Sequence, residues 1–292
     1  MADKLFSIRN YFFLGSYQSC IGEALKFSSK SEEEKILKDI FLYRSYIAQG
    51  QAFIPLKEIP TTTKSTELLA VRRFAEFRSN ESAKAKILAD VLQEVSSKSI
   101  PDEVSAVVAA AILNESSNTE AAFRAVSRFD GLEARASKIF TLVKMNKKKL
   151  ALAEVKKMNA IDEDATLTQL ANALVQTASG TGKVKDALYI YNEMAEKYGR
   201  TTDLDMHQAI VDTLTQDYQS ADELLSTALE RDSTDADVLI NSIVLAQHLE
   251  KDDDVVERFI SLLKHTHSSH PWTQDFFAKE AEFDRLATES SA

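Results

Sequence analysis

Three consecutive acids, residues 162–164, stand in the segment IDEDATL and suggest a calcium-binding loop. A loop of the EF-hand kind that begins at Asp162 requires glycine at its sixth position and glutamate at its twelfth. Those positions hold Leu167 and Ala173, so the calcium reading fails. The acids and Thr166 instead predict a helix start, where they face exposed amides and the positive end of the helix dipole.

The segment SGTGKV resembles the end of a phosphate-binding loop. Such a loop requires a glycine five residues before Gly182 and a serine or threonine after Lys183. The sequence has Thr177 and Val184 at these positions, and no strand precedes the segment. We therefore predict a turn.

Three histidines, His265, His267 and His270, lie close together in KHTHSSHPW and could hold a metal ion. No carboxylate or cysteine lies in that segment, and cations near a helix C-terminus have an electrostatic reason of their own. Cys20 is predicted to be buried, since no sequence order suggests a nucleophile with a supporting base. We predict no enzymatic activity: no catalytic residue, no metal site and no cofactor.

The composition limits the class of protein. The 292 residues carry a formal net charge of −10, which repels phosphate backbones and disfavours nucleic-acid binding. Seven glycines and four prolines leave little material for a strand-and-turn fold. One cysteine fits a reducing compartment. The apolar run VSAVVAAAIL is about half of the ~20 residues that span a membrane, and the start is not a secretory signal. We expect a soluble cytosolic protein.

A small residue followed by larger residues four and seven positions later recurs in predicted second helices of helix pairs. The copies are Cys20, Ala24 and Phe27; Ala151, Val155 and Met158; Ala187, Tyr191 and Met194; Ala221, Leu225 and Ala228; and Val255, Phe259 and Leu262. The last three copies start 34 residues apart, at positions 187, 221 and 255. This period is typical of tetratricopeptide repeats. The small residue lies where two helices approach most closely, and a glycine such as Gly15 lets the chain reverse between them.

The repeats predict an all-α, tetratricopeptide-like, right-handed α-solenoid of roughly eight helix-turn-helix repeats, with about 70 per cent or more helix. No boundary stands out, so residues 1–292 are predicted to form a single continuous domain. Residues 271–288 are predicted to form a terminal capping helix. Phe276, Phe277, Phe283 and Leu286 would seal the last repeat.

Several longer segments resemble one family, the epsilon subunits of coatomer, the COPI vesicle coat, in that family's order and at about its spacings. These segments are LFSIRNYFFLGSYQSCIGEA, KDIFLYRSYIAQG, KKMNAIDEDATLTQLANALV, DVLINSIVLAQHL and SHPWTQDFFAKEAEFDRL. The resemblance covers the whole chain, and its IDEDATLTQLA and its final HP…KE…FDRL are more specific than a repeat pattern.

That resemblance implies a non-enzymatic coat subunit that binds the C-terminal domain of the coat's alpha subunit. It also implies Golgi-to-ER retrograde and intra-Golgi transport, with the protein cytoplasmic and peripheral on Golgi membranes and COPI vesicles through the coat. The alternative is a cytosolic tetratricopeptide adaptor or co-chaperone that captures peptide tails. Arg9, Arg44 and Gln176, at groove-facing positions, are mixed in type and do not form the carboxylate clamp that such chaperone adaptors use.

One basic concentration is present, at Lys144, Lys147, Lys148, Lys149, Lys156 and Lys157. It would suit anionic lipid, where each charge gains roughly 1 kcal/mol, or the acidic patch of a partner. A solvated turn between helices is the other interpretation.

The first helix of each repeat lines the concave surface of a tetratricopeptide superhelix. Polar residues on first helices are therefore the predicted partner-binding set: Arg9, Arg44, Gln169, Asn172, Gln176, Asn241 and Gln247. Either several of them hydrogen-bond the backbone of an extended partner segment, or they satisfy neighbouring helices and face water.

Overall fold

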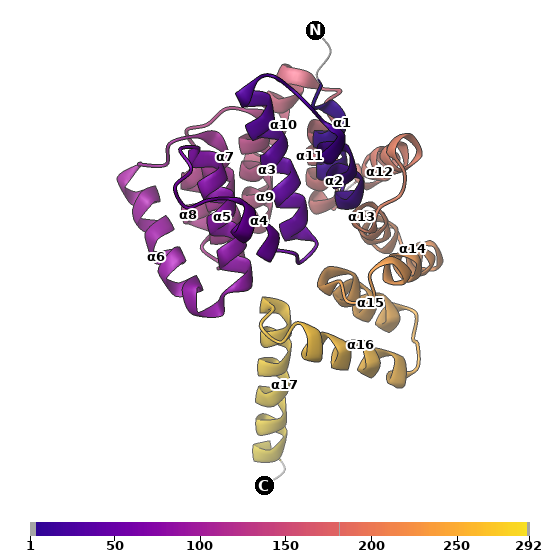
Figure 1. The fold of residues 1–292 in the computed structure, drawn as a ribbon. Coiled ribbons are helices and arrows are strands. Elements are labelled where there is room, and N and C mark those ends of the chain that lie inside the picture. The colour runs from indigo at the N-terminus through magenta and orange to yellow at the C-terminus, as the bar shows by residue number, and fades with distance from the viewer. Residues whose placement is uncertain (1–3, 181, 291–292) are drawn as a thin grey trace. The chain divides into compact units, whose positions relative to one another are not determined.

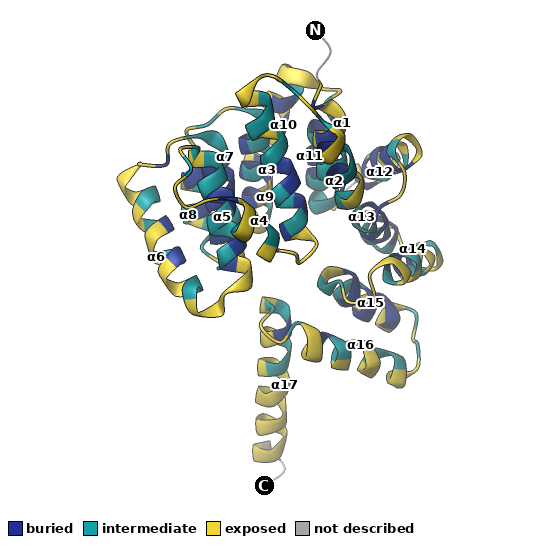
Figure 2. Ribbon diagram, viewed as in Figure 1, coloured by how far each residue is buried: buried dark blue, intermediate teal, exposed yellow. Residues whose placement is uncertain are grey.

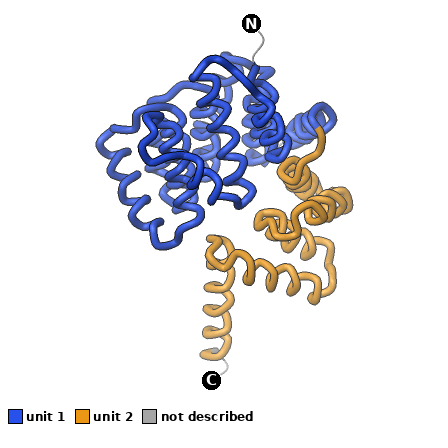
Figure 3. Tube along the Cα trace, viewed as in Figure 1, with its two compact units in different colours: residues 1–198 blue, residues 199–292 orange. Residues whose placement is uncertain are grey.

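Helices account for almost all of the structure. The computed structural model describes residues 4–180 and 182–290, and these residues form seventeen helices and no strand (Figure 1). Helix makes up 78% of the chain, which confirms the all-α prediction. The chain divides into two compact units, residues 1–198 and 199–292 (Figure 3). The single continuous domain expected over residues 1–292 stays a prediction.

Unit 1 contains six helix pairs. Their helices are α1 (Phe6–Phe13), α2 (Tyr17–Lys26), α3 (Glu32–Ala48), α4 (Phe53–Glu58), α5 (Thr66–Ser79), α6 (Glu81–Ser97), α7 (Glu103–Glu115), α8 (Thr119–Val126), α9 (Leu132–Lys144), α10 (Lys148–Asp162), α11 (Thr166–Ser179) and α12 (Val184–Tyr198). Unit 2 contains two pairs and a last helix: α13 (Thr202–Leu214), α14 (Tyr218–Arg231), α15 (Ala236–His248), α16 (Asp253–Thr266) and α17 (Pro271–Ser290). The pairs agree with the predicted number of repeats.

In most helix pairs the chain reverses through one residue in the left-handed conformation; α5 and α6 are instead joined by Asn80, with φ of −122°. Gly15 and Gly50 both have φ of 75°. In the first turn the Ser16 amide donates to the Tyr11 carbonyl at 2.8 Å, and the Gly15 amide donates to the Phe12 carbonyl at 3.1 Å. This Schellman motif satisfies carbonyls at the end of α1, so Gly15 lies in a hairpin turn, as predicted. The same conformation occurs without glycine at Ser117, Asn146, Gln216 and Glu250.

The predicted small residues lie where the second helices pack. Cys20, Ala151, Ala187 and Ala221 are all fully buried. Their partners at the fourth and seventh positions are also buried, except for the half-buried Phe27. The periodic pattern therefore identified the packing face of four second helices correctly.

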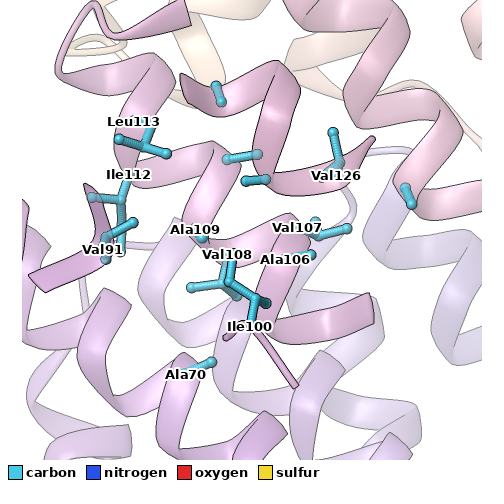
Figure 4. Packing of buried hydrophobic residues seen from close by; sticks show 14 of the residues in the cluster. Ala70, Val91, Ile100, Ala106, Val107, Val108, Ala109, Ile112, Leu113 and Val126 are labelled. Atoms are coloured by element: carbon cyan, nitrogen blue, oxygen red, sulfur yellow. The ribbon is translucent and has the colours of Figure 1, made fainter. Parts of the chain in front are cut away.

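Helix α7 lies at the centre of the largest apolar cluster of unit 1. It packs against α5, α6, α8 and α9, and its apolar residues are buried on nearly every side (Figure 4). A helix that is apolar all round must be covered all round, and this explains the run VSAVVAAAIL. Among the described residues, none of the helices combines the length and apolar content needed to cross a membrane.

The first helices of unit 1 form a closed row. Helices α1, α3, α5, α7, α9 and α11 contact one another in that order, and α11 also contacts α1. The second helices pack against these first helices. Among the described second helices of unit 1, α6 and α8 are the one pair that makes several contacts with each other. The inner surface of unit 1 is therefore built from first helices.

The last repeat differs from the prediction in two places. On α16 the triplet Val255, Phe259 and Leu262 is only half-buried, and the fully buried residue is Leu263. At the start of α17, Trp272 packs against the cluster around Leu263.

Two of the residues expected to seal the last repeat are exposed, and the capping role of residues 271–288 stays a prediction. Phe283 is 71% exposed and Leu286 is 49% exposed, and every described side chain from residue 278 to residue 289 is exposed (Figure 2). The physical reason is that no described element of unit 2 covers the second half of α17.

Leucine in place of Ala187 or Ala221 should lower stability by about 1–3 kcal/mol, because added methylenes overpack a helix–helix contact. Urea unfolding measures the change. Leucine in place of Ala160, which is exposed on α10, is the matched control and should change stability by about 0.5 kcal/mol or less. Unchanged midpoints at both buried sites would show that the repeat register is misplaced.

Cys20 should react slowly with a thiol reagent in the native protein. Its side chain is fully buried, and burial raises the pKa of its thiol. The thiolate that reacts is therefore both scarce and inaccessible. Reaction with a colorimetric disulfide reagent should become fast in urea, and an equally fast native reaction would contradict the packing of α2.

Candidate partner-binding site

Two adjoining hollows open on the inner surface of unit 1, with volumes of about 390 and 610 Å³. Their walls come from α1, α3, α7, α9 and α11, from the last residue of α10, and from the connection between α10 and α11. Both hollows are lined by Phe13, Glu133 and Leu167. We call the two hollows together the unit 1 groove.

An ion pair crosses the groove from α3 to α9. The Arg44 Nη2 atom lies 2.6 Å from Glu133 Oε1, and both side chains are mostly buried. The Arg44 guanidinium also lies 4.5 Å from the ring centroid of Phe12, a cation–π contact. Burying the two charges has a desolvation cost that their mutual attraction offsets only while both partners remain. The pair therefore couples two helices that α5 and α7 separate in the row.

Unpaired polar atoms lie close to this ion pair. Asn10 is 6% exposed and lines the larger hollow, while Asn114 is 5% exposed and lines the smaller one. Within the described part of the chain, Asn10 Nδ2, Asn114 Oδ1 and Arg44 Nη1 are buried and have no hydrogen-bond partner. An unmade buried hydrogen bond costs roughly 1–3 kcal/mol. The groove thus holds donors and an acceptor that an incoming segment could satisfy.

Asn114 is held in place by its other hydrogen bonds. Its Nδ2 donates to Thr141 Oγ1 at 2.9 Å, and the Thr141 hydroxyl donates to the Ser137 carbonyl at 2.8 Å. Lys144 Nζ donates to the Asn114 backbone carbonyl at 2.6 Å. The free Oδ1 atom is therefore fixed in position at the groove wall.

The structure places two of the seven predicted partner-binding residues in the groove. Arg9 lines the larger hollow and Arg44 lines the smaller one. Gln169, Asn172 and Gln176 lie on α11 but outside both hollows.

The amides of α11 bond mainly to nearby parts of unit 1. Gln169 Nε2 donates to the Glu163 carbonyl at 2.5 Å. Asn172 Nδ2 donates to Asn159 Oδ1 at 2.8 Å and to a carbonyl of its own helix. The Oε1 atom of Gln176 is buried with no described partner. Partner binding by these three residues stays a prediction.

The last two predicted residues belong to unit 2. Asn241 Nδ2 donates to the Asp237 carbonyl of its own helix at 2.7 Å, and Gln247 is exposed near the end of α15. Their role in binding also stays a prediction.

The residues that suggested calcium or metal binding in the sequence make local hydrogen bonds in the structure. Asp162 Oδ1 accepts hydrogen bonds from the amides of Asp164 and Ala165, both at 3.1 Å, in the connection before α11. His267 Nε2 lies 2.6 Å from the Thr234 carbonyl. Within residues 4–180 and 182–290, no group of three or more His, Cys, Asp or Glu side chains could hold a metal ion.

The segment SGTGKV joins two helices. Gly180 ends α11 with φ of 67°, and α12 begins at Val184. The prediction of a turn agrees with this placement, although Thr181 lies outside the described residues.

Known proteins give a consistent comparison. The family model described as coatomer epsilon subunit matches residues 1–291. Coatomer subunit epsilon of Caenorhabditis elegans is 74% identical over 292 residues, which cover 100% of both chains. The chain belongs to the coatomer epsilon subunit family. Coatomer subunit epsilon of Dictyostelium discoideum is 32% identical over 97% of each chain.

One solved structure supports the fold alone. A tetratricopeptide repeat protein from Parabacteroides merdae matches with a TM-score of 0.57 and 14% identity, covering 90% of this chain and 96% of that chain. The epsilon-family chain is therefore tetratricopeptide-like, as its repeats predicted.

Sequence reasoning missed several groove residues of this epsilon-family chain. Asn114 is a polar residue at the end of an otherwise apolar stretch, AVVAAAILN, and that contrast was a usable signal; Asn10 stands beside Arg9 in SIRNYFF, where the contrast is weaker. Phe6 and Phe140 line the groove and are about half exposed. Periodicity alone does not distinguish these aromatic residues from core residues.

Removing either charge of the groove ion pair should destabilise unit 1. Arg44→Met or Glu133→Gln should each cost about 3 kcal/mol, because each leaves the other charge buried and uncompensated. The double variant should lose less than the sum, which a double-mutant cycle in urea measures. Arg124→Gln is the control, since its pair with Glu120 is exposed and contributes about 0.5 kcal/mol or less. Fully additive losses would contradict the coupling.

Proposed function

We propose that this chain is a non-enzymatic structural subunit of the COPI coatomer coat, and that its unit 1 groove binds the C-terminal domain of the coat's alpha subunit. Membership of the coatomer epsilon family supports the first part. The closed row of first helices around a groove supports the second, because first helices form the binding surface in such repeats. The groove is the observation on which the proposal depends.

The chemistry of the groove suits a short extended segment of the partner. Asn10 offers a donor and Asn114 offers an acceptor, and a polypeptide backbone presents the complementary carbonyl and amide at every residue. Phe6, Phe13 and Phe140 add apolar wall between these polar atoms. Hydrogen bonds to the partner's backbone would fix the position of the segment in the groove, and the partner's apolar side chains would pack against the aromatic walls.

The size of the groove also favours a segment. Hollows of about 390 and 610 Å³ accommodate a few side chains rather than a folded domain. We infer that one projecting part of the alpha subunit's domain enters the groove, while the rest stays outside. Closure of the row between α1 and α11 means that entry involves a movement of α1 or of the partner's tip.

The rival function, capture of peptide tails by an adaptor, has less support in the groove. A carboxylate clamp needs an excess of cationic donors. The groove mixes three cations with four carboxylates: Arg9, Arg44 and Lys144, and Glu103, Glu115, Glu133 and Asp162. The mixture suits a neutral backbone better than a free carboxylate.

The cellular role follows from the coat. We infer a cytoplasmic protein that is peripheral on Golgi membranes and COPI vesicles through its coat partners, and that supports Golgi-to-ER retrograde and intra-Golgi transport. No nucleic acid is an expected partner, because the net charge of −10 repels phosphates.

Alanine in place of both Phe6 and Phe140 should weaken binding to the alpha subunit's C-terminal domain by about tenfold or more, because half-exposed aromatic residues at a groove act as anchors. Isothermal titration calorimetry measures the affinity. Tyr189→Ala, at an exposed aromatic residue of α12 outside the groove, is the matched control and should leave the affinity unchanged.

Circular dichroism should show native helicity for the wild type, the double variant and Tyr189→Ala, since the substituted side chains are exposed. Unchanged affinity of the double variant would exclude the groove as the binding site. Failure of the wild-type chain to co-elute with the alpha subunit's domain in size exclusion would remove the proposed function itself.

A further inference from the structure

The outer face of α10 carries positive charge that folding does not explain. Lys147, Lys148 and Lys149 occupy the N-cap and the first two positions of α10, and the first turn contains no acid. Cations at a helix N-terminus are unfavourable, by about 0.3–1 kcal/mol each. Within the described part of the chain, these three lysines and Lys156 have no hydrogen bond or ion pair from their side chains. Their position therefore points to a role other than stability.

Apolar side chains lie among these lysines. Leu152 is exposed and stands three residues after Lys149 and four before Lys156, so the three share one side of the helix. Leu150 and Ile161 are also exposed on α10. We call Lys149, Leu152 and Lys156, with their exposed neighbours on α10, the basic face.

A second uncovered face, of opposite charge, lies on α17. Phe283 and Leu286 are exposed, although they continue the line of Trp272 and Phe276, which stack on each other at 5.1 Å. A helical segment that packs against nothing is marginal in water. A covering partner would therefore stabilise the second half of α17.

Acids border this line of apolar residues. Glu280, Glu282 and Asp284 have no described ion pair, whereas Asp275 pairs with Lys279 and Glu289 pairs with Arg285 within the helix. Glu280, Phe283 and Asp284 lie at i, i+3 and i+4 and share one side of α17. We call this group, with Leu286, the acidic stripe.

We propose that the acidic stripe of one copy docks against the basic face of a second copy. Each surface presents an apolar side chain beside two like charges, and the charges of the two surfaces are opposite. A single contact thus covers both apolar groups and neutralises both charge groups. An anionic membrane would attract the basic face alone and repel the acidic stripe, so it accounts for half of the observations.

The contact joins different surfaces of the two copies and is therefore heterologous, which lets it extend from copy to copy. Two helical faces of this length bury little area, so association of the isolated chain is weak and depends on concentration. Because exposed charges contribute, it weakens at high salt. Such a contact suits neighbouring subunits of an assembled coat, where many copies are held close together. This role in the coat rests on the proposed function, whereas self-association of the chain does not.

Sedimentation equilibrium of the full chain over the micromolar range tests the proposal with two charge-reversed variants. Lys149→Glu with Lys156→Glu makes the basic face acidic, and Glu280→Lys with Asp284→Lys makes the acidic stripe basic. Each variant alone should self-associate about tenfold or more weakly than the wild type, because like charges then face each other. A mixture of the two variants should associate again, since each acidic face meets a basic one.

Lys30→Glu with Lys86→Glu is the matched control, because both lysines are exposed on other parts of unit 1. It should associate as the wild type does. A wild-type chain that stays monomeric at all concentrations would overturn the proposal, and so would variants that show no recovery when mixed.

Vesicles of phosphatidylcholine with phosphatidylserine serve as the second probe. Vesicle binding that Lys149→Glu with Lys156→Glu abolishes, in a wild-type chain without self-association, would assign the basic face to a membrane and overturn the proposal. Retention of native circular dichroism in every variant separates these results from misfolding.

Discussion

Tight reversal of the chain between paired helices, in most pairs through a single left-handed residue, is the constraint on which the rest of the structure depends. At Gly15 and Gly50 glycine adopts this conformation freely, whereas Ser117, Asn146, Gln216 and Glu250 adopt it at some steric cost. The paired Schellman hydrogen bonds offset that cost and end the first helix. The second helix then starts directly beside the first. A small residue such as Ala187 must therefore occupy the point of closest approach.

This local origin explains how much of the fold the sequence could predict. The turns and the small residues recur at fixed spacing, so the packing face of α10, α12 and α14 was identified residue by residue. The same reasoning failed for Phe283 and Leu286. An amphipathic pattern shows that one face of a helix is apolar, but it does not show that another element packs against that face. Closure of the first-helix row in unit 1 also escaped prediction. It depends on a contact between α1 and α11, which lie far apart in the sequence, and no local pattern records such a contact.

The candidate site shows the same limit. Arg9 and Arg44 line the groove, whereas Gln169 and Asn172 lie on the same kind of helix and bond to Glu163, after α10, and to Asn159, on α10. Partner binding by all four residues stays a prediction. Helical periodicity assigns a residue to one face of its helix. Whether the residue lines the groove also depends on its position along the helix axis, which periodicity does not give. Asn10 and Asn114 could have been found by asking why an amide interrupts an apolar helix, since a buried amide without full hydrogen bonding has a cost that packing does not repay.

Two features of unit 1 therefore lower its stability and have no structural explanation. Asn10 Nδ2 and Asn114 Oδ1 lie unpaired at the inner surface, and Lys148 and Lys149 lie at the unfavourable end of the α10 dipole. Departures from local rules of this kind are expected where a protein meets a partner. The first departure lies on first helices and the second on a second helix. Because these are different layers of unit 1, a segment in the groove and a copy on the basic face would not compete for the same atoms. An epsilon-family chain can thus hold one partner inside its row of helices while the outside stays available for contacts between neighbours.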